Sequence, residues 1–216
     1  MYIRAITEEK GCVTVTVCGG EENACQTFSI SNGRLRRLSV PLSEGLAVDE
    51  TLYSEIEYAS AVTDAVQLAA RILSVSDKSA RMLKRRLTEK GVEKSAAEEA
   101  VSFMVRKGYL DEYRQASVYA SSAVRTKLHG KRRIAKDLYA KGYDPAVIRQ
   151  VLDELSDEDC AAALQKYLDK TLEKSYNVDD NTMRRIAAAA ERLGHSPGEA
   201  LRCLRQYRSA DGDLQS

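Results

Sequence analysis

The sequence is poor in the residues that mark catalytic or metal centres, and poor in residues that interrupt helices. Among 216 residues there is no tryptophan, and there are two phenylalanines, two histidines and three prolines. Because proline breaks a helix interior, its scarcity is compatible with long helices. His129 and His195 lie far from any close pair of soft ligands, and no GxSxG, P-loop, GxGxxG or HExxH motif occurs. We therefore expect no enzyme activity, no cofactor and no metal.

Long apolar runs are missing as well. No run approaches the roughly 18 apolar residues of a membrane-spanning helix. The first residues, MYIRAITEEKGC, lack the apolar core of a signal peptide. These features predict a soluble, cytoplasmic protein that has no membrane partner.

The cysteines are five in number, and no CxxC pair occurs among them. An odd count without close pairs argues against a disulfide framework. Cys12 and Cys18 have the same parity, so one strand would place both on one face. We expect all five to be structural thiols.

Charge is balanced over the whole chain but not along it. Lys+Arg 33 against Asp+Glu 32 gives a net charge of +1. Residues 71–134, however, contain 16 basic and seven acidic residues, whereas residues 1–60 contain five and nine, and residues 135–216 contain 12 and 15. A cationic stretch in the middle of the chain is compatible with a solvated face, and also with a surface for phosphates or an acidic protein groove.

The first 40 residues have the pattern of short strands. The predicted strands are Tyr2–Thr7, Cys12–Cys18 and Cys25–Ile30. The turn-like residues Gly19–Asn23 separate the second strand from the third, and Ser31–Gly33 form another turn after the third. This predicts a small antiparallel sheet. From about Asp49 onward the apolar residues follow the helical period, and capping residues recur.

An internal repeat organises the helical part. Gly91, Gly142 and Gly194 stand 51 and 52 residues apart, and each follows a predicted helix. A basic–apolar signature precedes each glycine: Arg81-Met-Leu83, Arg132-Arg-Ile134 and Arg184-Arg-Ile186. A longer helix lies before each signature and another helix follows each glycine. The pattern predicts tandem three-helix units, stacked as an elongated array.

Helix-start signals subdivide these units. Ser76 is expected to precede the helix that ends at Gly91, and Ser95 with Glu98 to form a capping box. The predicted fold class is mainly α, with tandem three-helix repeats in an elongated array and a small N-terminal antiparallel β-sheet. The predicted segments are a β-rich extension (1–48), a linker helix with the first unit (49–110), the second unit (111–155), the third unit (156–208) and a disordered tail (209–216).

Basic side chains on the predicted helices are the candidates for binding. The simplest interpretation of these residues is an ordinary solvent-exposed helix face. The candidates are Arg81, Lys84, Arg85, Arg125, Lys127, Lys131, Arg132, Arg133, Arg184 and Arg185. Three tyrosines, Tyr109, Tyr113 and Tyr119, could stack on bases, but packing between helices is the favoured interpretation. The core is expected to include Leu83, Leu87, Leu110, Ile134, Leu138 and Leu152.

Several of these segments resemble one family when they are taken in order. The sequence resembles the RecX family of bacterial recombination regulators. The resemblance lies in Gly108-Tyr-Leu-Asp111-Glu-Tyr, Ala116, Gly130-Lys-Arg-Arg-Ile134, Leu138 and Lys141-Gly142-Tyr. Ser79, Arg81, Leu83, Leu87 and Lys90-Gly91 are similar to the same family. The family commonly places an aromatic residue where Gln115 stands here.

The resemblance implies a non-enzymatic regulator of the RecA recombinase, and we expect this protein to be a monomer. Members bind the RecA–single-stranded DNA filament and restrain its ATPase, strand-exchange and coprotease activities, and some bind DNA weakly. The alternative is a stand-alone helical DNA-binding protein or transcription regulator. That alternative favours base-reading Arg, Asn or Gln on a recognition helix together with dimer symmetry. No dominant Asn/Gln set is present, and the repeat argues against a two-fold dimer.

Overall fold

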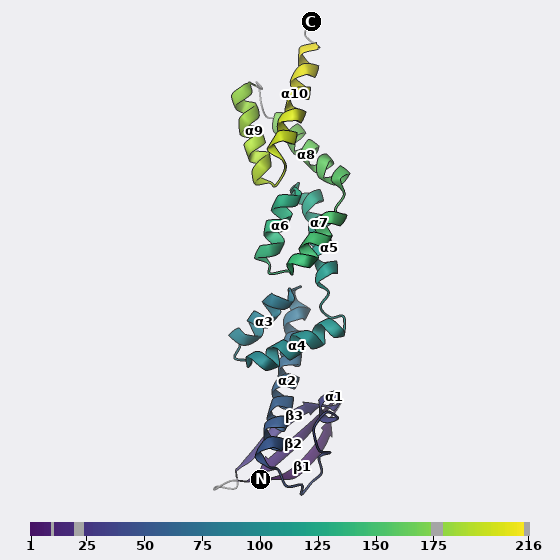
Figure 1. Cartoon of the computed structure of the whole chain (residues 1–216), viewed down its shortest axis with the longest axis vertical. Helices are drawn as coiled ribbons and strands as arrows, with labels where there is room; N and C mark the ends of the chain where they lie inside the picture. The colour runs from purple at the N-terminus through teal and green to yellow at the C-terminus, as the bar shows by residue number, and fades with distance from the viewer. Residues whose placement is uncertain (10, 20–23, 174–178, 214–216) are drawn as a thin grey trace. The chain divides into compact units, whose positions relative to one another are not determined.

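The computed structural model describes residues 1–9, 11–19, 24–173 and 179–213 (Figure 1). Three strands come first and helices follow to the end of the described chain. By its contacts the chain divides into two compact units, residues 1–110 and residues 111–216. The compact unit of residues 1–110 contains the sheet and the helices that follow it directly, and the compact unit of residues 111–216 contains the remaining described helices.

The sheet is antiparallel, with the strand order β1-β2-β3. Its strands are β1 (Tyr2–Glu9), β2 (Cys12–Cys18) and β3 (Cys25–Ser31). The short helix α1 (Asn32–Leu35) follows β3 directly. The small N-terminal sheet predicted from alternating β-branched residues is thus confirmed.

One face of the sheet packs on the N-terminal half of α2 (Glu50–Val75). Val13, Val15 and Val17 alternate along β2, and all three are buried against Ile56 and its neighbours on the helix. The same helix also satisfies the outer edge of β3, where the backbone amides of Ser29 and Ser31 donate to the hydroxyls of Ser60 and Thr63 at 3.1 and 3.0 Å. A strand edge that would otherwise present unpaired amides is therefore covered by helix side chains.

The cysteines of the sheet differ from the expectation of five thiols. Cys18 and Cys25 face each other across the β2–β3 pair and form a disulfide, whereas Cys12, Cys160 and Cys203 are free. The sequence could not show this pairing, because it depends on the register between β2 and β3 rather than on spacing within a motif.

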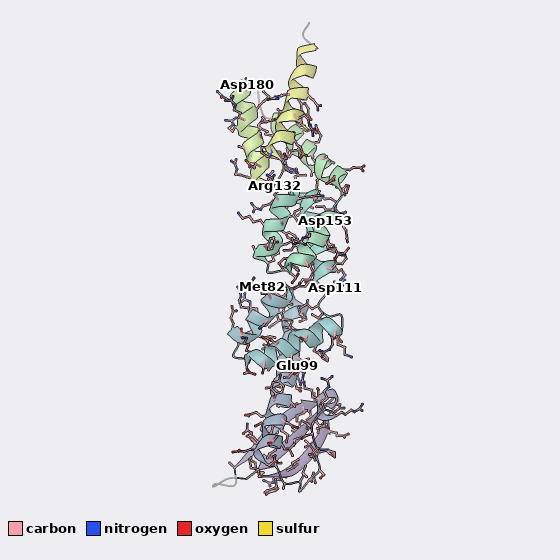
Figure 2. All side chains as sticks on the ribbon, viewed as in Figure 1. Met82, Glu99, Asp111, Arg132, Asp153 and Asp180 are labelled. Atoms are coloured by element: carbon pink, nitrogen blue, oxygen red, sulfur yellow. A yellow bond between two sulfur atoms is a disulfide. The ribbon has the colours of Figure 1, made fainter. Side chains whose placement is uncertain are left out.

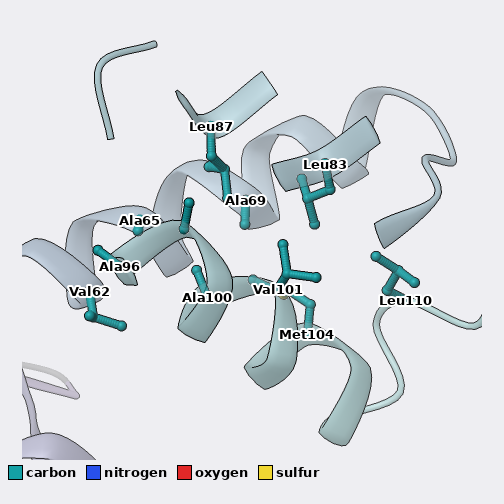
Figure 3. Packing of buried hydrophobic residues seen from close by; sticks show 11 residues of the cluster. Val62, Ala65, Ala69, Leu83, Leu87, Ala96, Ala100, Val101, Met104 and Leu110 are labelled. Carbon is teal, nitrogen blue, oxygen red and sulfur yellow. The ribbon is translucent and has the colours of Figure 1, made fainter. Parts of the chain in front are cut away.

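Helix α2 extends beyond the sheet and becomes the first helix of the first three-helix unit. Its C-terminal half packs with α3 (Ala80–Glu89) and α4 (Lys94–Arg106). Figure 3 shows Leu83 and Leu87 of α3 pointing toward residues of α2 and α4, among them Ala69 and Met104. One helix thus contributes to two hydrophobic clusters, one under the sheet and one within the three-helix unit.

Two helix starts in this unit differ from the predictions. The N-cap of α3 is Ser79, whose side chain accepts from the amide of Met82, and not Ser76. The N-cap of α4 is Glu93, whose carboxylate accepts from the amide of Ser95, so the predicted capping box of Ser95 with Glu98 is wrong. Helix α2 extends to Val75, so Ser76 follows a helix rather than opening one.

The second compact unit contains two further three-helix units. Ala116, Ile134 and Ile148 share one hydrophobic cluster, and Leu168 and Ile186 belong to another. The helices of the former are α5 (Glu112–Lys127), α6 (Lys131–Ala140) and α7 (Pro145–Glu154). Those of the latter are α8 (Asp157–Leu172), α9 (Asp180–Arg192) and α10 (Pro197–Asp213).

The middle helix of each three-helix unit ends in the same hydrogen-bonded turn. Gly91, Gly142 and Gly194 have φ values of 85°, 78° and 93°. In the first three-helix unit the amide of Gly91 donates to the carbonyl of Thr88, and the amide of Val92 donates to the carbonyl of Leu87. The equivalent pairs of bonds occur at Gly142 and Gly194. This is the Schellman arrangement, in which glycine accepts the left-handed conformation without a side-chain penalty.

A close backbone contact joins the two three-helix units of residues 111–216. The turn before α6 meets the turn before α10, where the amide of Gly130 donates to the carbonyl of Leu193 at 2.8 Å. A Cβ on Gly130 would lie 2.4 Å from the carbonyl oxygen of Gly194. The ring Nε2 of His195 lies 2.8 Å from the carbonyl oxygen of Leu128, and because a carbonyl only accepts, Nε2 carries the hydrogen.

These features confirm the predicted fold class of tandem three-helix repeats with a small N-terminal sheet. The predicted division into five segments and the elongated array stay predictions. Within the predicted tail, residues 209–213 continue α10, whereas residues 214–216 lie outside the described chain. The predicted core residues are buried, with the exception of Leu152, which is partly exposed.

Replacing Gly130 by alanine should destabilise the protein more than replacing Gly91. Gly130 has φ −84°, which suits any residue, so its cost comes from collision with the backbone of Gly194 and His195. Gly91 meets nothing within 4 Å of an added Cβ, so its cost is only conformational, about 1 kcal/mol. Urea denaturation measures both free energies of unfolding. Gly198→Ala is the control, because its Cβ makes only an ordinary contact. Equal effects of Gly130→Ala and Gly198→Ala would contradict the close contact.

Candidate interaction surface

One arginine occupies the same position in each three-helix unit. Arg81, Arg132 and Arg184 each lie ten residues before the glycine that ends the middle helix, and all three are exposed. Two residues later the chain carries a buried apolar side chain, such as Leu83 or Ile134. Residues two apart on a helix point in nearly opposite directions. Burial of the apolar residue therefore holds the arginine in solvent.

Several of the other predicted cations are already paired with carboxylates. Lys84 pairs with Glu98, and Arg85 pairs with Glu89 at 3.3 Å. In the next three-helix unit Lys131 pairs with Asp157 at 2.7 Å, and Arg133 pairs with Asp137 at 3.0 Å. These four predicted candidates have local partners, so their charges are less available to an incoming anion.

The remaining arginines are different. Among the residues that the structure describes, no carboxylate lies within ion-pair distance of Arg81, Arg125, Arg132, Arg184 or Arg185. Figure 2 shows the side chain of Arg132 on α6. The candidate surface is therefore narrower than the ten residues predicted from sequence, and its repeated element is the equivalent set Arg81, Arg132 and Arg184.

Lys127 belongs to a small cluster around Tyr119. Lys127 and Lys141 place their Nζ atoms 5.5 and 5.0 Å from the centre of the Tyr119 ring. The Tyr119 hydroxyl donates to Asp137 Oδ2 at 2.9 Å. Burial, together with this hydrogen bond and the Asp137 charge, raises the pKa of Tyr119 to about 12. The aromatic face is thus occupied by two cations of the same chain.

Asp137 is the residue that sequence reasoning missed. It accepts hydrogen bonds from Tyr119 and Arg133, and its Oδ2 lies 3.5 Å from His129 Nδ1. Burial opposes its ionisation, but these hydrogen bonds and the nearby positive charges outweigh burial, so the pKa of Asp137 lies below its ordinary value. Its position four residues after Arg133 was the available signal, because such pairs share a helix face.

The three tyrosines considered for stacking occupy different environments. Tyr109 is 67% exposed, so the expectation that it packs between helices is wrong. Tyr113 is also exposed, at 39%, and its hydroxyl donates to Glu154 of α7. Tyr119 is partly buried in the cluster described above. Gln115 is buried and accepts a hydrogen bond from the hydroxyl of Tyr143.

Among the described residues, no group of three or more His, Cys, Asp or Glu side chains is placed to hold a metal ion. Within the same part of the chain, no helix has both the length and the apolar character needed to cross a bilayer.

The architecture defines the class of protein: three-helix units in tandem, following a small β-sheet. Residues 65–104 match the family model described as RecX, first three-helix domain. A regulatory protein RecX of Streptomyces coelicolor is 27% identical over 157 residues, which cover 70% of this chain and 81% of that protein. The RecX of Bacillus licheniformis is 29% identical over 156 residues, covering 72% and 59%.

Solved structures share the fold. A crystal structure of regulatory protein RecX matches with a TM-score of 0.73 at 18% identity, and the match covers 92% of this chain and 96% of that one. The crystal structure of RecX from Lactobacillus salivarius matches with a TM-score of 0.62 at 15% identity, covering 69% and 97%. Residues of the first three-helix unit thus match the RecX family model, and the chain is similar to RecX proteins in sequence and in fold.

Acid should destabilise the protein partly through His129. Burial lowers the pKa of His129 below its ordinary value of about 6.5, although Asp137 opposes the shift. The unfolded chain therefore binds the proton first, and this contribution to stability is lost as the pH falls below about 6.5 toward the folded-state value. We expect His129→Gln to flatten the fall in the free energy of unfolding between about pH 7 and pH 5. Chemical denaturation across this range measures the difference, and parallel curves for both proteins would contradict the prediction.

Proposed function

We propose that this protein binds the RecA–single-stranded DNA filament and modulates, mostly by inhibition, the recombinase, ATPase and coprotease activities of RecA. The relatives carry the name regulatory protein RecX, which supports a regulatory role. The observation that carries the proposal is the recurrence of an exposed arginine at the same position of three successive units, Arg81, Arg132 and Arg184. An arginine that recurs at equivalent positions suits a partner whose binding surface also repeats.

Arginine is suited to such contacts because its planar guanidinium forms paired hydrogen bonds with carboxylates and phosphates. A contact of this kind at each of three units would be modest alone, but linked contacts raise the overall affinity. Single-stranded DNA is bound weakly or through the filament, and the protein acts as a monomer in this proposal. The elongated array predicted from the repeat would let the units reach several RecA protomers.

A second candidate function is a stand-alone helical DNA-binding protein or transcription regulator. The same unpaired arginines favour it, since guanidinium groups also bind DNA phosphates. The two functions differ in what the protein recognises. Binding to DNA without RecA, with a measurable sequence preference, would support the second function, whereas binding that needs RecA would support the first.

Charge reversal at the repeated arginines should weaken filament binding. We expect the triple variant Arg81→Glu, Arg132→Glu, Arg184→Glu to bind the RecA–single-stranded DNA filament at least about tenfold more weakly, because three charge-assisted contacts become repulsive. It should correspondingly lose inhibition of DNA-dependent ATP hydrolysis by RecA. Fluorescence anisotropy and a coupled ATPase assay measure the two effects.

A control variant separates position from total charge. Lys90→Glu, Lys136→Glu, Arg192→Glu changes the net charge by the same amount at exposed positions of the same three helices or their ends. It should retain most of the affinity, and both variants should keep the wild-type melting temperature. If the two triple variants bind equally well, the repeated arginines are not the contact set. If the wild-type protein leaves ATP hydrolysis unchanged even in excess, RecA is not its target.

Salt should weaken the complex only moderately if three arginines make phosphate contacts. Three contacts to a single strand predict a loss of roughly 20-fold in affinity between 50 and 200 mM salt. Six contacts to a single strand would give a loss of roughly 300-fold. A titration of affinity against salt concentration, measured by anisotropy, gives the slope. If the affinity does not change with salt concentration, these arginines contact protein carboxylates, and little counterion is released.

A further inference from the structure

The first compact unit contains a cavity of about 580 Å³ beside the sheet. Its lining residues come from the ends of β2 and β3, from α1 and the residues after it, and from α2 and the C-terminal end of α4. The volume falls within the roughly 300–1,000 Å³ that small-molecule sites occupy. None of the ten basic residues considered above lines it, so it is separate from the candidate interaction surface.

Four cations from two separate parts of the fold line this cavity. Arg34 and Arg37 lie at and just after α1, and Arg106 and Lys107 lie at the end of α4. Glu99 pairs with Arg34 and lies 3.9 Å from Arg37, and the hydrogen bond from Arg34 lowers the pKa of Glu99 so that it stays ionised. One carboxylate against four cations leaves the cavity with an excess of positive charge.

Arg106 and Lys107 have no ion-pair partner among the described residues. Lys107 instead places its Nζ 6.0 Å from the centre of the Phe103 ring. A cation at the end of a helix is commonly explained by the helix dipole. That explanation does not account for Arg37, which comes from a different segment, lines the same cavity and is 68% exposed at its side chain.

The rest of the cavity wall provides an apolar surface and a side-chain amide. Val66 and Phe103 line the cavity as apolar groups, and Gln67 contributes a side-chain amide that can both donate and accept. Thr63 also lines it, but its hydroxyl already accepts from Ser31 N and donates to the carbonyl of Ala59. A ligand that matches this wall has an apolar planar part, hydrogen-bonding edges and a compact anionic group.

We propose that this cavity binds a nucleoside phosphate, either free or as one unit of a single strand. Its phosphate meets Arg37, Arg106 and Lys107, its base lies against Val66 and Phe103, and Gln67 hydrogen-bonds the base edge. A terminal phosphate monoester concentrates about two negative charges on one group, and a phosphodiester within a strand carries one. An acidic peptide would need several carboxylates inside the same volume, so the phosphate matches the charge of the cavity better. The inference does not rest on the proposed binding to RecA.

The test uses the full chain and two probes, adenosine monophosphate and an oligothymidylate of about eight nucleotides. Isothermal titration calorimetry of the wild type and of Arg106→Ala, Lys107→Ala gives the affinities. We expect at least one probe to bind and the double variant to weaken it about tenfold or more. Loss of adenosine monophosphate binding assigns a free nucleotide to the cavity. If the double variant loses binding of the oligothymidylate only, the occupant of the cavity is one nucleotide unit of a strand.

Arg192→Ala is the matched control, because Arg192 occupies the last turn of α9 as Arg106 occupies that of α4 but does not line the cavity. It should bind both probes like the wild type. Unchanged affinities of the double variant, or no binding of either probe, would overturn the proposal. Binding of a polyglutamate peptide alone, weakened in the double variant, would also overturn it and would make the occupant an acidic peptide.

Cys12 provides a second readout that does not depend on substitution. It is a partly exposed free thiol in the cavity wall, whereas Cys160 and Cys203 are free thiols elsewhere. Saturating concentrations of the bound probe should slow alkylation of Cys12 and leave the other two unchanged, as peptide mass spectrometry can measure. Equal alkylation of Cys12 with and without the probe would place the binding outside this cavity. The triple arginine variant designed for the filament should keep this protection, so failure of one proposal leaves the other testable.

Discussion

The turn that ends each middle helix is the constraint on which the helical part of this structure depends. Two hydrogen bonds return to the last helical turn at Gly91, Gly142 and Gly194, and glycine tolerates the positive φ that they require. The chain then reverses, and the next helix packs on the apolar side chains of the one that has just ended. In this way a unit of about 50 residues acquires its own core, and the same device can be repeated.

This constraint also explains where the candidate arginines lie. The buried Leu83, Ile134 and Ile186 fix the rotation of each middle helix, so the arginine two residues earlier points into solvent. The surface feature is thus a consequence of the core. A change that rotated the helix would move the arginine as well, and for this reason binding experiments on these positions need a measurement of stability beside them.

Much of this was readable from the sequence because it is local. The glycine spacing and the alternation in Cys12–Cys18 each involve a few neighbouring residues. Glu93 replaces Ser95 as the cap of α4 for a local reason, but the other failures depend on more of the chain than a local pattern contains. The Cys18–Cys25 bond depends on strand register, and the choice of Ser79 over Ser76 depends on how far α2 extends. The environment of Gly130 depends on Leu193 and Gly194, over 60 residues away.

The candidate site shows the same division between local and distant information. Sequence identified ten cations correctly as basic positions on helices, but it could not separate those with partners from those without. Lys131 is paired with Asp157, beyond the end of α7, whereas its neighbour Arg132 has no carboxylate partner in the described chain. An exposed pair is worth little to stability, yet it orients and partly neutralises its cation. The partners therefore decide which charges can meet a ligand, and five of the ten candidates, Arg81, Arg125, Arg132, Arg184 and Arg185, have no ion-pair partner in the described chain.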